Sequence, residues 1–288
     1  MTASTKVRVA GYVHVVAAAL CAGLVVGALF GPSISRADED PAPIGEGVVA
    51  AEEGYRIVPT TSELDRRGGA FAFQIQDQVG EPVTEYEELH ERPLHLIVVS
   101  RDMAEFHHVH PTLDTTGTWT VQLPPLPPGS YRAITDFWVT GGPRLALGVD
   151  LYVAGTHERA EPGTPTDVSY VDGYEVTLAA TTGATGEVTA TLTVRRNGGI
   201  VEPDPYLGAN GHLVALRAGD LAYAHVHPDE DDHDTDSESD GGVRFEANLD
   251  SAGRYGLFFD FRHGGTVHTA TFTFDQTAVT DPIEMEMS

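Results

Sequence analysis

The stretch LHLIVVSRDMAEFHHVHP, residues 94–111, sets the plan of the chain, because it returns as GHLVALRAGDLAYAHVHP, residues 211–228. In each copy a first histidine precedes the two histidines of a His-x-His-Pro motif by 13 and 15 residues. Self-similarity at a fixed spacing is typical of a duplicated structural unit. The repeated histidines are His95, His108 and His110 in the first copy and His212, His225 and His227 in the second.

Each copy has the pattern of a hairpin, with an apolar strand, a short polar turn and a second strand. With turns at Asp102-Met103 and Gly219-Asp220, the first and third histidines of each triplet face each other across the hairpin. Side chains alternate across a strand, so both motif histidines share a face and His107 points to the other. Cross-strand neighbours lie about 5 Å apart and diagonal ones about 7–8 Å, so each triplet is expected to converge.

The rest of the chain predicts an all-β fold of two tandem immunoglobulin-like antiparallel β-sandwiches after an N-terminal signal or anchor helix. Short apolar runs alternate with Gly/Pro turns, which is typical of sandwiches of about 100 residues each. Repeat 1 is expected at residues 55–155 and repeat 2 at residues 167–276, joined by a Pro/Gly/Thr-rich linker at 156–166.

A second pattern repeats with the histidines: Gly-x-Tyr followed by Asp-Phe. It places Tyr131 before Asp136 and Tyr255 before Asp260. In immunoglobulin-like sandwiches such a tyrosine fixes a corner at the start of a strand, so both tyrosines are expected to be structural. Each aspartate is expected to pair with an arginine or cap a loop rather than bind metal.

Residues 1–37 are expected to direct export. A small basic region precedes an apolar run at residues 9–30, and Ser-Arg-Ala stands before Asp38 like a signal-peptidase site. The run is also long enough to span a bilayer, so an uncleaved transmembrane anchor is the alternative. Both interpretations place the rest of the chain outside the cytoplasm. Residues 38–54, rich in Pro, Gly, Ala and Glu, are expected to form a flexible stalk.

The exported part is strongly acidic and lacks cysteine. Beyond residue 37 there are 14 arginines and no lysine against 43 acidic residues, a net charge of −29. Such a surface repels nucleic acid and anionic lipid and attracts cations. The single cysteine, Cys21, lies in the export segment, which excludes disulfides, cysteine catalysis and zinc–thiolate sites from the folded part.

Two acidic segments stand apart from the strand pattern. Residues 229–242, DEDDHDTDSESDGG, lengthen the loop after the second His-x-His-Pro motif, and residues 277–288 form an acidic tail. The long loop lacks the glycine and the terminal glutamate of an EF-hand at the required offsets. We therefore expect it to be a solvated loop.

Several motifs resemble those of a known group of proteins. HLIVVSRDMAEFHHVHP, PPGSYRAITDFWVTGGPRLALGVDLYVAG, PYLGANGHLVALRAGDLAYAHVHP and FDFRHGG lie between Phe71 and Phe274. They resemble actinobacterial exported proteins with tandem immunoglobulin-like domains and His-x-His-Pro motifs. The resemblance implies two sandwiches and a loose association with heavy-metal or copper handling. The acidic loop and His107 depart from the pattern of that group.

The two triplets predict a divalent transition metal site in each repeat. Imidazole suits zinc, copper(II) or nickel, and three histidines leave a position open for water or a further ligand. His90 is the candidate fourth ligand in repeat 1, and His263 or His268 in repeat 2. The apolar residues around the histidines also allow a purely structural role, in which buried imidazoles bond to the backbone and hold each hairpin.

The sequence also bears on two further function classes. A metal-dependent enzyme would need a placed general base, and the chain has no nucleophile elbow, phosphate loop or dinucleotide fingerprint. The sequence therefore favours a non-enzymatic protein that binds zinc or copper(II). The alternative is an extracytoplasmic structural or partner-binding module, which a sandwich fold permits without favouring any particular partner.

Overall fold

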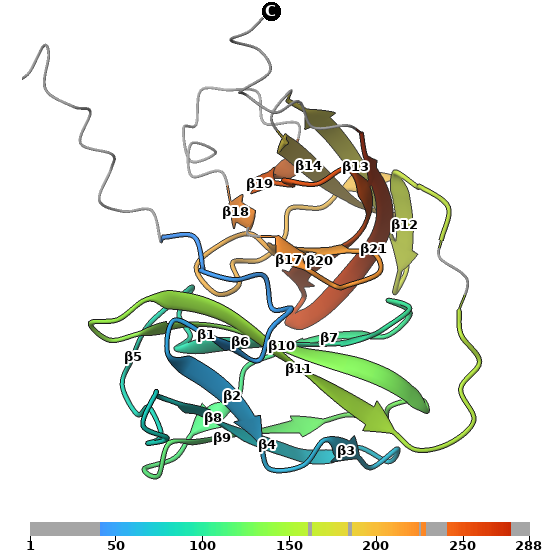
Figure 1. The fold of residues 1–288 in the computed structure, drawn as a ribbon. Coiled ribbons are helices and arrows are strands. Elements are labelled where there is room, and N and C mark those ends of the chain that lie inside the picture. Colours follow the sequence, from blue (N-terminus) through green and yellow to red (C-terminus); the bar gives the residue numbers. More distant parts are fainter. Residues whose placement is uncertain (1–40, 161–162, 184–185, 225, 229–240, 278–288) are drawn as a thin grey trace, which may run out of the picture. The chain divides into compact units, whose positions relative to one another are not determined.

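The computed structural model describes residues 41–160, 163–183, 186–224, 226–228 and 241–277 (Figure 1). These residues form strands and loops and contain no helix, so none that could span a membrane is found among them. The expected export segment, most of the acidic loop and the acidic tail lie outside the described residues.

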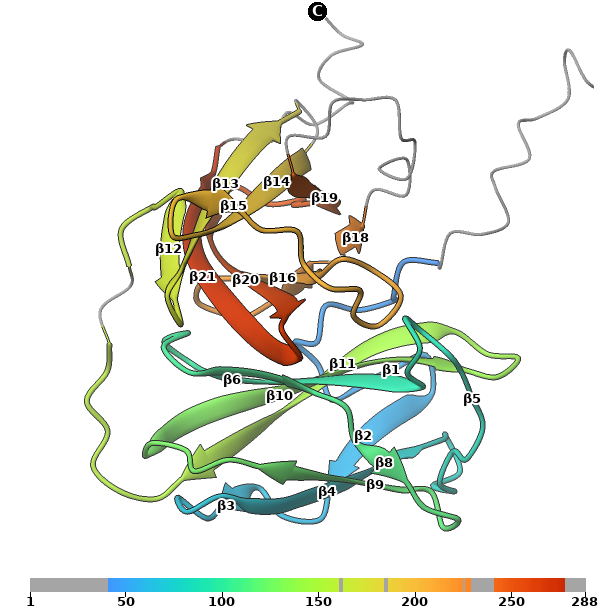
Figure 2. The same cartoon turned by 180° about the vertical axis from the view of Figure 1, so that it is seen from behind.

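Repeat 1 is a sandwich of two sheets, which Figure 2 shows as separate layers with β4 and β9 in one and β6, β10 and β11 in the other. The first sheet has the order β1 (Ala51–Glu52), β2 (Tyr55–Pro59), β4 (Gly69–Gln76), β9 (Thr118–Leu123) and β8 (Thr112–Leu113). The second has the order β3 (Glu63–Leu64), β11 (Arg144–Val153), β10 (Gly129–Val139), β6 (Leu94–Ser100) and β7 (Phe106–Val109), and β5 (Tyr86–Glu87) also pairs with β10.

Repeat 2 has the same plan. Its first sheet has the order β12 (Val168–Val171), β13 (Tyr174–Thr182), β14 (Glu187–Arg196), β19 (Gly242–Asn248) and β18 (Val226–Pro228), and β15 (Gly199–Ile200) also pairs with β14. The second has the order β17 (Tyr223–Ala224), β16 (His212–Arg217), β20 (Gly253–His263) and β21 (Thr266–Gln276).

The strand order of both repeats is that of immunoglobulin-like sandwiches, in which strands A, B, E and D form one sheet and G, F and C the other. In repeat 1 these sheets are β2-β4-β9-β8 and β11-β10-β6-β7; in repeat 2 they are β13-β14-β19-β18 and β21-β20-β16-β17. The Tyr131 hydroxyl donates to Pro127 O at 2.8 Å and the Tyr255 hydroxyl to Ser251 O at 2.9 Å. The expected tandem all-β sandwiches and their two tyrosine corners are confirmed.

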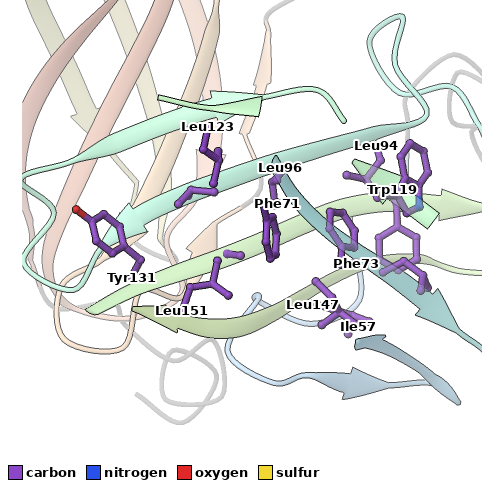
Figure 3. Packing of buried hydrophobic residues seen from close by; sticks show 14 of the residues in the cluster. Ile57, Phe71, Phe73, Leu94, Leu96, Trp119, Leu123, Tyr131, Leu147 and Leu151 are labelled. Carbon is purple, nitrogen blue, oxygen red and sulfur yellow. The ribbon is translucent and has the colours of Figure 1, made fainter. Parts of the chain in front are cut away.

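Each sandwich encloses its own apolar core, because the strands alternate between inward apolar and outward polar side chains. In repeat 1, Phe71 of β4, Leu96 of β6 and Leu147 of β11 meet between the sheets, as Figure 3 shows. In repeat 2, Phe245 of β19 packs against Phe259 of β20 with ring centroids 5.8 Å apart.

A third apolar cluster lies between the repeats rather than inside either one. It joins Ile97, Val99 and Ile134 of repeat 1 to Val214, Leu216, Leu221 and Phe258 of repeat 2. The rings of Phe106 and Phe258 stack with centroids 4.0 Å apart and planes 5° apart. Most of these residues occupy the outward faces of β6, β10, β16 and β20. His95 of β6 and His212 of β16 share those faces, so both lie where the two sheets pack together.

The segment expected to be a flexible stalk is held against β11 from residue 44 on. Ile44 N donates to Arg144 O at 2.8 Å, and Gly47 O accepts from Arg132 Nε at 2.8 Å. The approach is close, because a Cβ added to Gly148 would lie 1.9 Å from Gly47 O. Composition indicated flexibility here because it reports polarity and turn residues, whereas the edge of β11 offers backbone partners that composition does not record.

Candidate metal centre

The first histidine triplet is assembled by the hairpin of β6 and β7. The pairs Leu96 with Val109 and Ile97 with His108 fix its register, which is the register expected from the sequence. His95 lies on β6, His108 lies on β7, and His110 directly follows β7. The alternation of side chains along both strands brings all three rings to the face that packs toward repeat 2.

The three rings converge. His95 Nδ1 lies 3.0 Å from His108 Nε2 and 3.2 Å from His110 Nε2, and all three atoms lie within 4.8 Å of one another. The ring centroids are 4.9–5.2 Å apart. Four ligands placed tetrahedrally at 2.0–2.1 Å from a zinc ion have nitrogens about 3.3–3.4 Å apart. The two spacings measured from His95 Nδ1 are therefore close to what a single metal ion requires.

The hydrogen-bond partners of His95 Nε2 and His108 Nδ1 show which nitrogen of each ring carries the hydrogen. The other nitrogen of each ring faces the cluster with a lone pair. His95 Nε2 donates to Leu89 O at 2.8 Å, since a carbonyl oxygen can only accept. His108 Nδ1 lies 3.0 Å from Asp260 Oδ2, and in the neutral ring it carries the hydrogen. The inward atoms, His95 Nδ1 and His108 Nε2, then present two lone pairs to each other at 3.0 Å. Two lone pairs at this distance repel each other, and a cation between them would turn the repulsion into attraction.

The surroundings disfavour a proton on His95 and on His110. Burial, with smaller contributions from His108 and His110, holds the pKa of His95 well below its usual value. Burial, followed by the neighbouring His108, lowers the pKa of His110 to about 3. Neutral imidazoles are the form that ligates a metal, so these two rings keep their lone pairs near neutral pH.

Two more histidines border the triplet. The His212 ring lies 6.2 Å from that of His95 and 6.1 Å from that of His108, centroid to centroid, and its Nε2 donates to Tyr206 O at 3.1 Å. The His90 ring lies 5.4 Å from that of His212 and 6.0 Å from that of His95. These four rings line a cavity of about 30 Å³, enough for about one water molecule. Burial, followed by His108 and His90, lowers the pKa of His212 to about 3.

The second triplet does not assemble as expected among the described residues. The register of β16 and β17 is the expected one, with Ala215 opposite Ala224, but the hairpin ends there. His227 lies on β18, opposite Glu246 of β19 in the other sheet, so it does not face His212. His225 lies outside the described residues. Within the described ranges, His95, His108 and His110 are the residues grouped closely enough to hold an ion.

The two other candidate ligands of repeat 2 have different partners. His268 Nδ1 lies 2.7 Å from Asp172 Oδ2, and His263 Nδ1 lies 2.7 Å from the Tyr174 hydroxyl. Asp172 lies in the turn between β12 and β13, and Tyr174 is the first residue of β13 after that turn. This arrangement directs one nitrogen of each ring to that turn and brings neither residue into the grouped triplet.

The two repeated aspartates have different roles. Asp136 pairs with Arg144 at 2.8 Å, as expected, and also accepts from the Tyr223 hydroxyl of repeat 2 at 3.1 Å. Asp260 was expected to find an arginine or cap a loop, but it accepts from His108 of the other repeat. The repeat contained a signal that these aspartates lie near the histidines: Asp136 is the cross-strand neighbour of His95, and Asp260 is the cross-strand neighbour of His212. No sequence pattern indicated that the two faces would meet.

The family described as Domain of unknown function (DUF8832) matches residues 50–150 and again residues 169–278. The chain belongs to this family. Two consecutive matches to one domain confirm the internal duplication expected from the histidine motifs.

No curated protein matches the chain. Among solved structures, similarity is found to the surface layer protein SbsC, domains 4–9, with 15% identity over 76% of this chain and 30% of that one and a TM-score of 0.21. Invasin, a bacterial integrin-binding protein, gives 16% identity over 77% and 39% with a TM-score of 0.22. A two-domain fibronectin type III segment of chicken tenascin gives 8% identity over 76% and 97% with a TM-score of 0.23. Scores this low bear on neither the architecture nor the function of the chain.

Proposed function

We propose that this protein is an exported, non-enzymatic tandem β-sandwich protein that binds one divalent transition metal ion through His95, His108 and His110. The observation that carries the proposal is the 3.0 Å distance between His95 Nδ1 and His108 Nε2. The opposite nitrogens of these rings are hydrogen-bonded to Leu89 O and to Asp260. Metal-bound histidines usually donate their second nitrogen to a carbonyl or a carboxylate, and Leu89 O and Asp260 supply one of each.

The donor set favours zinc or copper(II). All three ligands are imidazoles, which suit these ions, whereas calcium and magnesium require oxygen ligands. Copper(I) favours thioether and thiolate ligands. Met103 packs against the apolar cluster between the repeats, and the single cysteine lies in the export segment. Three protein ligands leave a fourth position for water or an added ligand.

Export and the absence of catalysis are parts of the same proposal. The N-terminal pattern of a signal peptide or anchor supports an extracytoplasmic location, and the net charge of −29 would raise the local concentration of cations. The resemblance to exported actinobacterial proteins with copper association agrees with this role. Asp260 accepts from His108 and Thr269, and Asp136 accepts from Arg144 and Tyr223, which favours binding over acid–base chemistry.

The test is metal analysis of the exported fragment, purified without a histidine tag. We expect elemental analysis and calorimetry at pH 7.5 to give one equivalent of zinc or copper(II) per chain, because one converged triplet is described. Uptake of no divalent transition metal would refute the proposal. Two equivalents would indicate that the second triplet also forms a site.

A structural role is the second candidate, and the same short contacts favour it. If His108 carries both protons, it donates to His95 Nδ1 and to Asp260 at once and holds the two repeats together. The protein would then be an extracytoplasmic structural or partner-binding module. In that case calorimetry would detect no metal, while His108→Ala would still lower the free energy of unfolding of the metal-free protein.

A further inference from the structure

The candidate metal centre depends on a contact that only the docked repeats can make. His108 belongs to repeat 1 and Asp260 to repeat 2, and their side chains lie 3.0 Å apart with 5% and 6% of their surface exposed. The Thr269 hydroxyl donates to the other oxygen of Asp260 at 2.5 Å. Repeat 2 therefore fixes the carboxylate, and docking brings it to the outer nitrogen of a metal-ligand candidate.

The two carboxylates of the interface differ in how their charge is balanced. Asp136 is paired within its own repeat by Arg144, whose Nε lies 3.0 Å from Oδ1 and whose second contact is 2.8 Å. Asp260 receives its hydrogen bonds from the His108 imidazole of repeat 1 and the Thr269 hydroxyl of its own repeat, and neither donor is an arginine. Removing a carboxylate from water is costly unless a cation compensates it. A divalent ion bound to His108 Nε2 would supply positive charge directly behind the donor to Asp260.

We propose that metal binding at the His95/His108/His110 cluster and docking of the two repeats are coupled through the His108–Asp260 contact. This inference rests on the proposed metal site. An ion on His108 makes the opposite N–H a stronger donor, which favours the docked state; docking in turn orients His108 and raises its basicity, which favours the ion. The two effects are equal by linkage, because a coupling free energy acts in both directions.

The surrounding interface is suited to such coupling. The apolar cluster between the repeats, with its Phe106–Phe258 stack, is smaller than either core. A single polar contact can therefore shift the equilibrium between docked and undocked repeats. A second contact, from the Tyr223 hydroxyl to Asp136, also crosses the interface at 3.1 Å and ends on a carboxylate rather than on a ligand candidate. It provides a matched control, since its removal weakens docking without touching a ligand candidate.

The test compares the exported fragment with the variants Asp260→Asn and Tyr223→Phe in zinc and copper(II) competition titrations. Loss of an outer partner of a metal-bound histidine typically costs about 10–100-fold in affinity, and we expect a loss in that range for Asp260→Asn. Tyr223→Phe should stay within about threefold of the original protein. If Asp260→Asn fails to fold, Thr269→Ala, which frees the carboxylate from its own repeat, should give a smaller loss of about three- to tenfold.

The reverse direction is read by hydrogen exchange. Metal should slow exchange of backbone amides in β16 and β20 of the original protein, and this slowing should be reduced in Asp260→Asn, which a purely structural aspartate would not cause. Metal binding with unchanged affinity in Asp260→Asn, or in Thr269→Ala where that variant decides, overturns the coupling and leaves the metal site standing. An original protein that takes up no metal overturns the proposed function itself.

Discussion

The two repeats share their strand order and their tyrosine corners, yet they treat the same histidine motif differently. In repeat 1, β7 stays paired with β6 through Val109, and the chain reaches the other sheet at β8, residues 112–113. In repeat 2, β17 ends at Ala224 and β18 has already joined the other sheet at Val226. The crossing occurs earlier in repeat 2 relative to the motif, so it carries His227 away from His212. A conserved spacing therefore does not guarantee a conserved site.

The repeated aspartates also differ between the two repeats, although they hold the same position in the motif. Asp136 is neutralised by Arg144 of its own repeat, whereas Asp260 reaches His108 of the other repeat. Duplication supplied two equal faces, and packing them together gave each face a different part of one site. Repeat 1 supplies the candidate ligands, and repeat 2 supplies the carboxylate that orients one of them.

The sharpest test of this difference is a matched pair of histidine variants. His110 and His227 hold the same position in the motif. We expect His110→Ala to lower zinc or copper(II) affinity by more than about 100-fold, beyond the cost typical of losing an outer partner, because it removes one of three ligands. His227→Ala should leave affinity and stoichiometry unchanged in the same calorimetric titration. An equal loss in both variants would show that repeat 2 forms a site of its own.

Acid should lower the free energy of unfolding mainly through the buried histidines that lie between the two repeats. The pKa values of His110 and His212 are about 3 in the folded protein, against 6.5 in a free side chain. The unfolded chain binds more protons between these values, so the free energy of unfolding of the metal-free protein falls as the pH drops below about 6.5. Each such histidine contributes about 1.4 kcal/mol per pH unit.

Urea denaturation at pH 7.5, 6.0 and 5.0 measures this slope. The variant His212→Asn should lose part of it, because it removes one of the buried neutral rings at the junction. A free energy of unfolding that does not change over this range would show that these rings are protonated in the folded protein or are not buried.

The smallest expected effect concerns what the repeats have in common. Tyr131→Phe and Tyr255→Phe each remove one hydrogen bond to a backbone carbonyl four residues earlier. Each substitution should lower the free energy of unfolding by about 1 kcal/mol, the usual net contribution of such a bond. Urea denaturation of both variants at neutral pH compares them directly. A clear inequality would show that the two corners are not equivalent, despite their matching geometry.

Much of the fold could be predicted from local pattern. Alternating apolar residues and Gly/Pro turns gave most of the longer strands, and the turn positions gave the register of both hairpins. Short strands such as β3, β5 and β8 were not predicted, since two residues carry no periodic signal. Residues 38–54 were predicted as a stalk because their composition is polar and rich in turn residues, although Ile44, Gly47 and Val49 have backbone partners on β11.

The sequence by itself determined the duplication, the all-β class, the hairpin that gathers His95, His108 and His110, and the corner tyrosines, because each depends on residues close in the chain or on the period of a strand. The tertiary structure alone decided that the two histidine-bearing faces pack together, that His212 borders the first triplet rather than forming a second, and that Asp260 serves His108. These contacts join residues more than 100 positions apart. They depend on where two sheets meet and where each chain crosses between sheets, and neither is encoded in the spacing of a motif.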